Sequence, residues 1–230
     1  MAHFNSVSLG LLTVLFTMLF SEFTKYIPKI LNQQLPATTA HLKMAPLERR
    51  ESLQADYYTK YNPRKSAVMM LFYPKNNEAT LVLIKRNTYP GIHSAQISFP
   101  GGKAEVGDAN LAETALRETF EEVGVAVTDV DVVMPFTEIY IPPSNFLVAP
   151  FLGIAVNELA FKPSPDEVAE LIELPLDVFL DDSIVINTKM QTSYAQSIDV
   201  PAFKVGEHII WGATAMIMSE LKETIKNTLK

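Results

Sequence analysis

Glycine is scarce in this chain and unevenly placed, and its placement is the strongest constraint on the fold. Nine of the 230 residues are glycine, and five of these nine lie between Gly91 and Gly124. Because glycine allows backbone angles that other residues rarely adopt, such a cluster predicts a segment of special turns. Residues 99–125, FPGGKAEVGDANLAETALRETFEEVGV, are therefore predicted to run from a strand end through a tight loop into a helix.

The residues after this loop predict where the helix begins and ends. Asn110 is suited to the N-cap, Glu113 is suited to be its capping-box partner, and Gly124 is suited to end the helix. The helix is therefore expected over residues 111–123. At 100° per residue, the apolar stripe expected to pack on a sheet consists of Ala112, Leu116, Phe120 and Val123.

The opposite side of the expected helix is acidic. Glu118, Glu121 and Glu122 are spaced i, i+3 and i+4, which brings their carboxylates toward a common point, and Arg117 lies at the edge of this face. From the helix alone, a solvated acidic face and a cation site both remain open. The preceding PGGK loop favours the cation site, because glycine carbonyls and carboxylates are hard oxygen ligands for Mg²⁺ or Mn²⁺. Lys103 in this loop is an expected phosphate contact.

A divalent ion at this position would indicate a site that handles phosphate. The ion neutralises charge on a diphosphate and lowers the pKa of a bound water, and a glutamate left over from coordination accepts the water's proton.

Composition restricts the partners and the location. The chain has 19 Lys and Arg against 26 Asp and Glu, a net charge of −7, so bulk binding of nucleic acid is not expected. A small anionic substrate would need local basic residues or a metal ion. With no cysteine, the chain has no disulfide, thiolate nucleophile or cysteine-ligated zinc. A cytoplasmic location is expected, and a homodimer is left open.

Residues 101–125 resemble the Nudix box, whose pattern is G-x5-E-x7-R-E-U-x-E-E-x-G-U, where U is aliphatic. The match is close over residues 117–125, apart from Thr119 in an aliphatic slot, whereas the first glutamate of the pattern falls on Ala109, next to Asp108. The resemblance implies an α+β fold, a Nudix-type α/β/α sandwich around a mixed β-sheet. It also implies roles for several residues: Glu118, Glu121 and Glu122 as metal ligands, Arg117 as their orienting ion-pair partner, and Gly101 or Gly102 as a backbone ligand.

The segment before the box is similar to the additional motif of Nudix coenzyme A pyrophosphatases. Arg86, His93, Gln96 and residues 99–102 match this motif, while Gly91 replaces a basic residue and Ala95 replaces a glycine. The resemblance covers about residues 26–221. It implies hydrolysis of coenzyme A or its thioesters to 3′,5′-ADP and a 4′-phosphopantetheine product. Hydrolysis of ADP-ribose, NADH or a dinucleoside polyphosphate, and an inactive ligand sensor on the same fold, remain alternatives.

Several residues outside the box are candidates for binding a small nucleotide substrate. Arg86 would bind phosphate or be solvated, and His93 would contact substrate or order its loop. In the YIPPSN turn, two prolines are expected to leave the side chains of Tyr140 and Asn145 free to contact a ligand, although turn structure alone would also explain the motif. Trp211 is expected in the core.

The remaining pattern predicts the division of the chain. Residues 66–73 and 80–85 are expected to form a hairpin, and further strands are expected at 96–99, 130–133, 138–141 and 147–154. Helices are expected at 47–58, 167–179 and 214–229. The acidic residues Asp166 and Glu167 are expected to open the second of these helices, with a supplementary base as the alternative role. Residues 26–65 form an N-terminal arm, 66–221 the Nudix domain and 222–230 a C-terminal tail.

The N-terminal 25 residues form an apolar extension whose role the sequence leaves open. The run at residues 7–20 is shorter than the roughly 20 residues that a membrane-spanning helix needs and lacks the basic start of a secretion signal. An amphipathic helix, a loose membrane anchor and an upstream extension absent from a native chain that starts at Met18 are the alternatives. A membrane partner is not expected unless residues 7–20 are a genuine anchor.

Overall fold

The structure is a computed structural model that describes residues 18–88, 90, 93–192 and 195–230. The helices are α1 (Phe20–Thr24), α2 (Ile27–Leu31), α3 (Ala37–Met44), α4 (Leu111–Val123), α5 (Leu176–Leu180) and α6 (Gly212–Thr228). Short 3₁₀ turns lie at Leu47–Arg49, Glu51–Leu53, Thr59–Tyr61, Val127–Asp129, Pro142–Ser144 and Asp182–Ile184.

Within the described residues, two sheets are present. The main sheet contains β1 (Arg64–Lys75), β2 (Glu78–Arg86), β3 (Ile97–Ser98), β4 (Gly101–Lys103), β5 (Asp131–Pro135), β6 (Ile139–Ile141), β7 (Phe146–Ile154) and β8 (Val168–Pro175). Its central order is β3-β2-β1-β7-β5, and it is mixed because β1 and β7 run parallel while β1 and β2 run antiparallel. The second sheet consists of β9 (Val185–Thr192), β10 (Ala195–Val205) and β11 (His208–Ile210).

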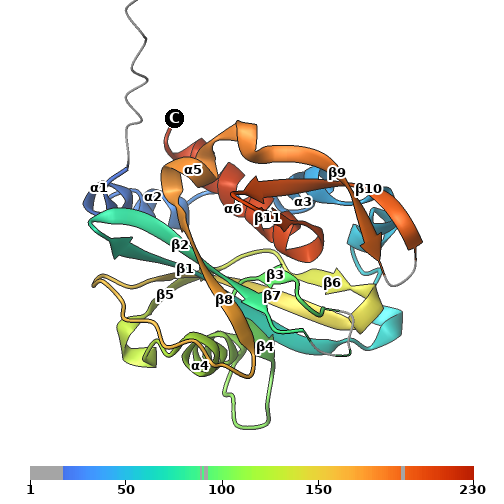
Figure 1. Cartoon of the computed structure of the whole chain (residues 1–230), viewed down its shortest axis with the longest axis horizontal. Helices are drawn as coiled ribbons and strands as arrows, with labels where there is room; N and C mark the ends of the chain where they lie inside the picture. Colours follow the sequence, from blue (N-terminus) through green and yellow to red (C-terminus); the bar gives the residue numbers. More distant parts are fainter. Residues whose placement is uncertain (1–17, 89, 91–92, 193–194) are drawn as a thin grey trace, which may run out of the picture.

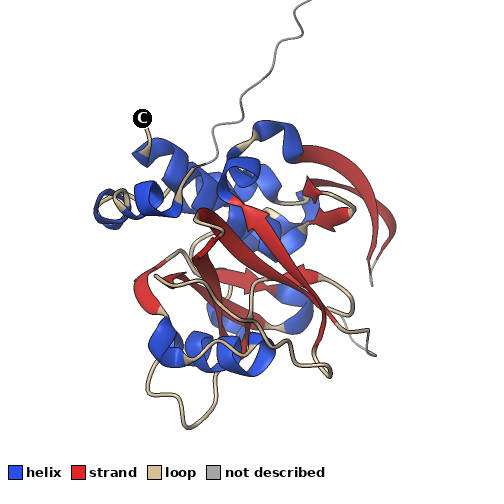
Figure 2. Ribbon diagram, turned by 60° about the vertical axis from the view of Figure 1, so that its left-hand side comes forward, coloured by secondary structure: helices blue, strands red, loops and turns tan. Residues whose placement is uncertain are grey.

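The main sheet lies between two layers of helices. Figure 1 shows α4 below the sheet and the other helices above it, and Figure 2 shows the same separation from another side. Side chains alternate along β1, because Met70 and Phe72 join the core with α6, whereas Met69 and Leu71 join the core with α4. The expected α/β/α sandwich around a mixed sheet is confirmed.

The predicted limits of α4 are confirmed, and its predicted packing face is right in part, because Val123 is buried and Leu116 packs against the same core. Asn110 Oδ1 accepts from the N–H groups of Ala112 and Glu113, and Gly124 ends the helix with φ +74°. Glu113 differs from the capping-box expectation, because its carboxylate accepts from Ala109 N–H. Phe120, expected on the sheet, is 54% exposed. The helix is rotated so that the Glu122 side chain reaches Gly101 in β4. The buried residues of the helix are Thr114, Ala115, Thr119, Glu122 and Val123.

Three other secondary-structure expectations are wrong. Residues 168–175 form β8, which pairs antiparallel with β2, and only 176–180 are helical. The helix expected at residues 47–58 is a series of 3₁₀ turns. The sequence pattern does not predict the second sheet, which lies within residues 185–210. The predicted hairpin, the four shorter strands and the C-terminal helix are each found within a few residues of their expected limits.

Met18, the first residue that the structure describes, contacts the main sheet. Its carbonyl accepts from Ala79 N–H at 3.2 Å, and Phe20 and Phe23 are buried against the sheet. Most of the apolar run at residues 7–20 lies outside the described residues. In the part of the chain that the structure describes, no helix has the length and hydropathy needed to cross a membrane.

Candidate active site

Glu122 is fully buried where α4 meets β4. Its Oε2 accepts from Gly101 N–H at 2.7 Å, and Arg86 Nη1 lies 3.2 Å from Oε1. The Arg86 contact lacks hydrogen-bond geometry, so Oε1 has no hydrogen-bond partner. Burial raises the pKa of Glu122 to about 7, although Arg86 and Gly101 N–H act in the opposite direction. A buried carboxylate oxygen without a hydrogen bond is costly, so this position suits a cation.

Glu118 occupies the space beside Glu122 and lies against the β4 backbone. A Cβ atom added at Gly102 would come within 2.4–2.5 Å of the Glu118 carboxylate atoms, so any larger residue here would displace that carboxylate. Burial raises the pKa of Glu118, while Arg117 lowers it and other carboxylates raise it further. Two carboxylates and a glycine backbone therefore meet at one corner of the molecule.

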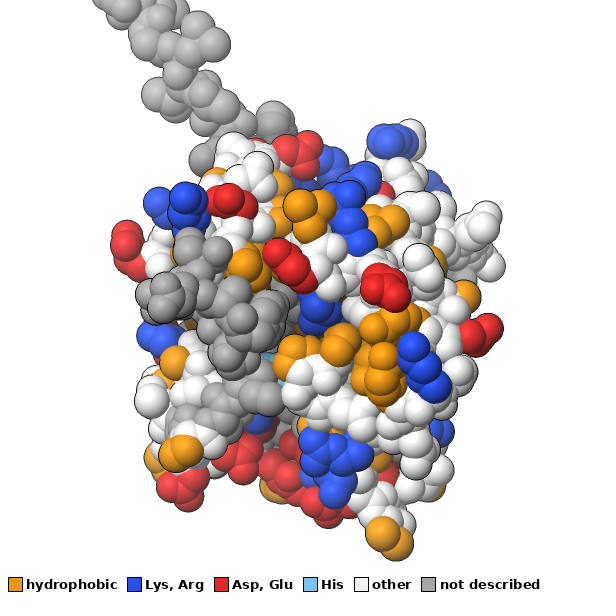
Figure 3. Space-filling view, turned by 90° about the vertical axis from the view of Figure 1, so that its right-hand side faces the viewer, with side chains coloured by type: hydrophobic (Ala, Val, Ile, Leu, Met, Phe, Trp, Pro, Cys, Tyr) orange, Lys and Arg blue, Asp and Glu red, His pale blue; other side chains and the backbone are white. Residues whose placement is uncertain are grey.

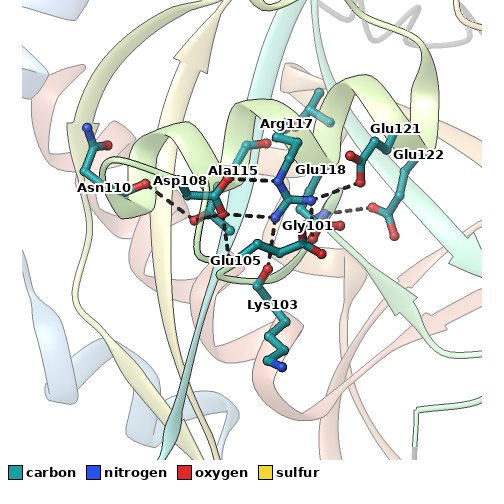
Figure 4. A network of polar contacts seen from close by, with 12 residues as sticks. Gly101, Lys103, Glu105, Asp108, Asn110, Ala115, Arg117, Glu118, Glu121 and Glu122 are labelled. Carbon is teal, nitrogen blue, oxygen red and sulfur yellow. Dashed lines mark hydrogen bonds and ion pairs between the residues drawn. The ribbon is translucent and has the colours of Figure 1, made fainter.

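Arg117 organises this corner through its guanidinium group. Nε donates to Asp108 Oδ1 at 2.9 Å, Nη1 donates to Glu118 and Glu121 at 3.0 Å each, and Nη2 donates to the Lys103 carbonyl at 3.0 Å. Figure 4 shows the guanidinium between Asp108 on one side and the two glutamates on the other. Arg117 holds the pKa of Asp108 well below its usual range. Asp108, next to the position where the family pattern has a glutamate, thus anchors Arg117.

The three glutamates do not converge on one point. Glu121 is half-exposed and held by Arg117, while Glu122 turns toward Gly101. Among the described residues, no group of three or more histidine or acidic side chains is arranged to hold a metal ion. The residues nevertheless fit a hard cation, because Glu122 Oε1 lacks a hydrogen bond and Glu118 fills the space beside Gly102.

A fourth carboxylate, that of Glu167, acts on the same corner through its charge. It precedes β8 rather than opening a helix, so the dipole role expected for it is wrong. Its charge raises the pKa of both Glu118 and Glu122, which places it within electrostatic reach of them. Its carbonyl accepts from Asn87 N–H at 2.9 Å, directly after β2. The strand pairing of β8 with β2 brings Glu167 to the site, and helical periodicity could not reveal that pairing.

A cavity of about 730 Å³ adjoins this corner and brings several expected substrate-binding residues together. It is lined by Arg86, His93, Gln96 and Lys103, with Gly101 and Gly102 on the side that contacts the buried glutamates. Lys85 and Arg49 add further positive charge. On the face seen in Figure 3, lysine and arginine side chains are interspersed with acidic side chains, and no extended basic surface is visible. Such a lining suits a small anion.

His93 and Gln96 contact each other at the cavity wall. His93 Nδ1 lies 3.0 Å from Gln96 Oε1, which supports the loop-ordering alternative for His93. Between them, Ala95 adopts φ +56°, a left-handed conformation that favours glycine. The structure thus explains why a glycine occupies this position in the family motif. Gly91, the other departure from that motif, lies outside the described residues.

Ala95→Gly is expected to stabilise the protein, because glycine removes the cost of the left-handed backbone angle. The expected gain is about 1 kcal/mol, or roughly 2–4 °C in the unfolding temperature. Thermal unfolding followed by circular dichroism measures it. Ala126→Gly, at an ordinary φ of −64°, is the matched control and is expected to destabilise slightly. A lower unfolding temperature for Ala95→Gly than for wild type would contradict this explanation.

The structure differs from the expectation for Tyr140 and Asn145. The Tyr140 hydroxyl donates to Asn145 Oδ1 at 3.0 Å, and Asn145 Nδ2 donates to the Tyr61 carbonyl. Tyr140 is 4% exposed and stacks on Tyr61, with ring centroids 5.7 Å apart. Neither residue lines the cavity. Both side chains are therefore occupied in closing the β6–β7 turn and are not free for a ligand.

Sequence comparison identifies the family to which this site belongs. The model of the NUDIX domain matches residues 63–190, more than half of the chain. The chain belongs to the NUDIX domain family. It is 33% identical over 165 residues to Nudix hydrolase 22, chloroplastic, of Arabidopsis thaliana, covering 69% of this chain but only 54% of that protein.

Other relatives match over similar lengths. Mitochondrial coenzyme A diphosphatase NUDT8 of Homo sapiens is 31% identical over 157 residues, which cover 67% of this chain and 66% of that protein. NudL of Yersinia enterocolitica, named as an uncharacterized Nudix hydrolase, is 32% identical, covering 64% and 75%. The solved structure of the M. smegmatis Nudix hydrolase RenU aligns with a TM-score of 0.49 and 16% identity, over 72% and 87% of the two chains.

Proposed function

We propose that this Nudix protein hydrolyses the diphosphate linkage of coenzyme A or its thioesters, giving 3′,5′-ADP and a 4′-phosphopantetheine product. The observation that carries the proposal is the corner where buried Glu122 and Glu118 meet Gly101 and Gly102 beside a basic cavity. The name of the human relative, a coenzyme A diphosphatase, supports this substrate, as does the motif that includes Arg86, His93 and Gln96.

In the proposed site, Glu118 and Glu122 would hold Mg²⁺ or Mn²⁺, with Glu121 and the Gly102 backbone as further oxygen ligands. The bound ion would supply charge neutralisation on the diphosphate and activation of a water molecule. Arg117 positions Glu118 and Glu121, because its Nη1 donates to both carboxylates.

The remaining steps of the proposal use side chains around the corner. Arg86 and Lys103 line the cavity and bind phosphate oxygens of the substrate. Glu167 is exposed beside Glu118 and Glu122, and it accepts the proton that the attacking water loses. In this assignment Glu122, the most buried of these carboxylates, is a metal ligand and not the base.

A substrate panel with product identification tests the proposed reaction. Coenzyme A, acetyl-coenzyme A, NADH, ADP-ribose and a dinucleoside polyphosphate are incubated with the full chain and Mg²⁺ or Mn²⁺, and products are resolved by mass spectrometry. We expect 3′,5′-ADP from coenzyme A and its thioester, at the highest kcat/KM of the panel, and none in EDTA. Faster turnover of NADH or ADP-ribose would favour the alternative substrate class, and tight binding without metal-dependent products would favour a ligand sensor.

A further inference from the structure

The cavity has two chemically different walls. Three of its cationic side chains, Lys85, Arg86 and Lys103, belong to the main sheet next to the acidic corner. The other wall comes from the second sheet and the start of α6, and its apolar lining includes Met190, Ile209, Trp211 and Ile217. Three of these four residues lie beyond residue 190, where the match to the family model ends.

The second wall is fixed to the main sheet by polar contacts. His208 Nε2 lies 3.2 Å from Glu170 Oε1, which joins β11 to β8. The Thr214 hydroxyl donates to the Ile97 carbonyl at 2.9 Å, which joins the start of α6 to β3. Trp211 immediately precedes α6 and is only partly buried, so it is not the core residue that the sequence suggests. These two contacts tie the chain on either side of Trp211 to the main sheet, and the Trp211 side chain lines the cavity.

The side chains that line the cavity near this wall indicate which part of a nucleotide substrate binds there. Glu207 lines it, and a carboxylate repels phosphate but accepts from an exocyclic amine. Ser98 Oγ and Ser144 Oγ also line the cavity, and both are buried without a hydrogen-bond partner. Each of these hydroxyls can donate to a ring nitrogen of a base. A planar base also stacks well on an indole ring.

We propose that Trp211 is the platform on which the adenine ring of the substrate stacks. The nucleotide half then fills the cavity, with its phosphates toward Arg86 and Lys103, and the other half extends away from it. The inference rests on the proposed function only in taking an ADP-containing diphosphate as substrate. It assigns Trp211 as a specificity-determining residue for this site.

Trp211 is the only tryptophan of the chain, so its fluorescence reports on this wall directly. Full-length protein in EDTA is titrated with 3′,5′-ADP, 4′-phosphopantetheine and inorganic pyrophosphate. We expect saturable quenching with 3′,5′-ADP and no change with the other two. Quenching or a spectral shift with 4′-phosphopantetheine but not with 3′,5′-ADP would overturn the proposal. Because this titration needs no turnover, quenching by 3′,5′-ADP without any hydrolysis of coenzyme A would refute the proposed reaction but not the stacking site.

Kinetics of two substitutions complete the test. Trp211→Leu is expected to raise KM for the best substrate of the panel about tenfold or more, with kcat within about twofold, because stacking binds substrate and transition state alike. Trp211→Phe keeps an aromatic face and is expected to restore most of the affinity. Tyr61→Leu removes a 43% exposed ring outside the cavity and serves as the matched control. Equal KM values for all three variants and wild type would overturn the proposal.

Discussion

Glu122→Gln is expected to lower kcat for the proposed hydrolysis by about 100-fold or more while the fold persists. Glutamine keeps the shape of the side chain and an oxygen for Gly101 N–H, but it removes the charge that the cation needs. Steady-state kinetics with a Mg²⁺ titration measure the loss. Glu105→Gln, an exposed carboxylate in the loop before α4, is the matched control and is expected to retain wild-type rates. A wild-type kcat in Glu122→Gln would remove Glu122 from the proposed site.

The pH dependence of the unfolding temperature tests whether the Glu122 carboxyl is buried in the metal-free protein. Burial raises the pKa of Glu122 from 4.5 to about 7. Between these values the carboxyl is protonated in the folded protein and ionised in the unfolded chain, so metal-free stability falls as pH rises. The unfolding temperature of wild type in EDTA is therefore expected to fall relative to that of Glu122→Gln between pH 5 and pH 8. Parallel curves for the two proteins would contradict the buried, metal-free carboxyl.

Gly102→Ala is expected to reduce metal-dependent activity about 10- to 100-fold, since the added Cβ would lie 2.4 Å from the Glu118 carboxylate and would displace it. The backbone of Gly102 is not in the left-handed region, so alanine adds a contact without backbone strain. The half-saturating concentration of Mg²⁺ is expected to rise together with the loss of kcat. Kinetics at several Mg²⁺ concentrations measure both effects.

Gly107→Ala is the matched control for this substitution. It lies in the loop between β4 and α4, and a Cβ there would meet nothing within 4 Å. Wild-type activity in Gly107→Ala together with impaired activity in Gly102→Ala assigns the effect to the Glu118 contact. Equal activity in the two variants would show that the position of the Glu118 carboxylate does not matter for the reaction.

The sequence predicted α4 well because local signals determine its ends. The Asn110 side chain satisfies backbone N–H groups of the first turn, and Gly124 supplies the left-handed angle at the last, so both ends depend on neighbouring residues. The packing face of α4 depends instead on a contact with β4. Glu122 is buried because it accepts a hydrogen bond from Gly101 in β4, and Phe120 is left exposed. Likewise, Val168, Ile172 and Leu174 become strand residues because β2 offers an unpaired edge, which no helical periodicity reveals.

The same distinction holds in the candidate site. The spacing of Glu118, Glu121 and Glu122 located the acidic corner, but the arrangement within it depends on Arg117, whose partner Asp108 lies nine residues earlier in the loop. Tyr140 and Asn145 have the donors of ligand-binding residues, yet they bond to each other because the turn closes on them. The cavity wall at Trp211 is formed by the second sheet, so only tertiary structure could show it.

Binding of Mn²⁺ measured by electron paramagnetic resonance tests the central claim most directly, because it reports on the ion at the corner and not on turnover. The wild-type protein, Glu118→Gln, Glu122→Gln and the control Glu105→Gln are titrated under identical conditions. We expect Mn²⁺ to bind wild type and Glu105→Gln with equal affinity, and to bind Glu118→Gln and Glu122→Gln at least about tenfold more weakly. Mn²⁺ affinities in Glu118→Gln and Glu122→Gln equal to that of wild type would contradict the proposed metal site.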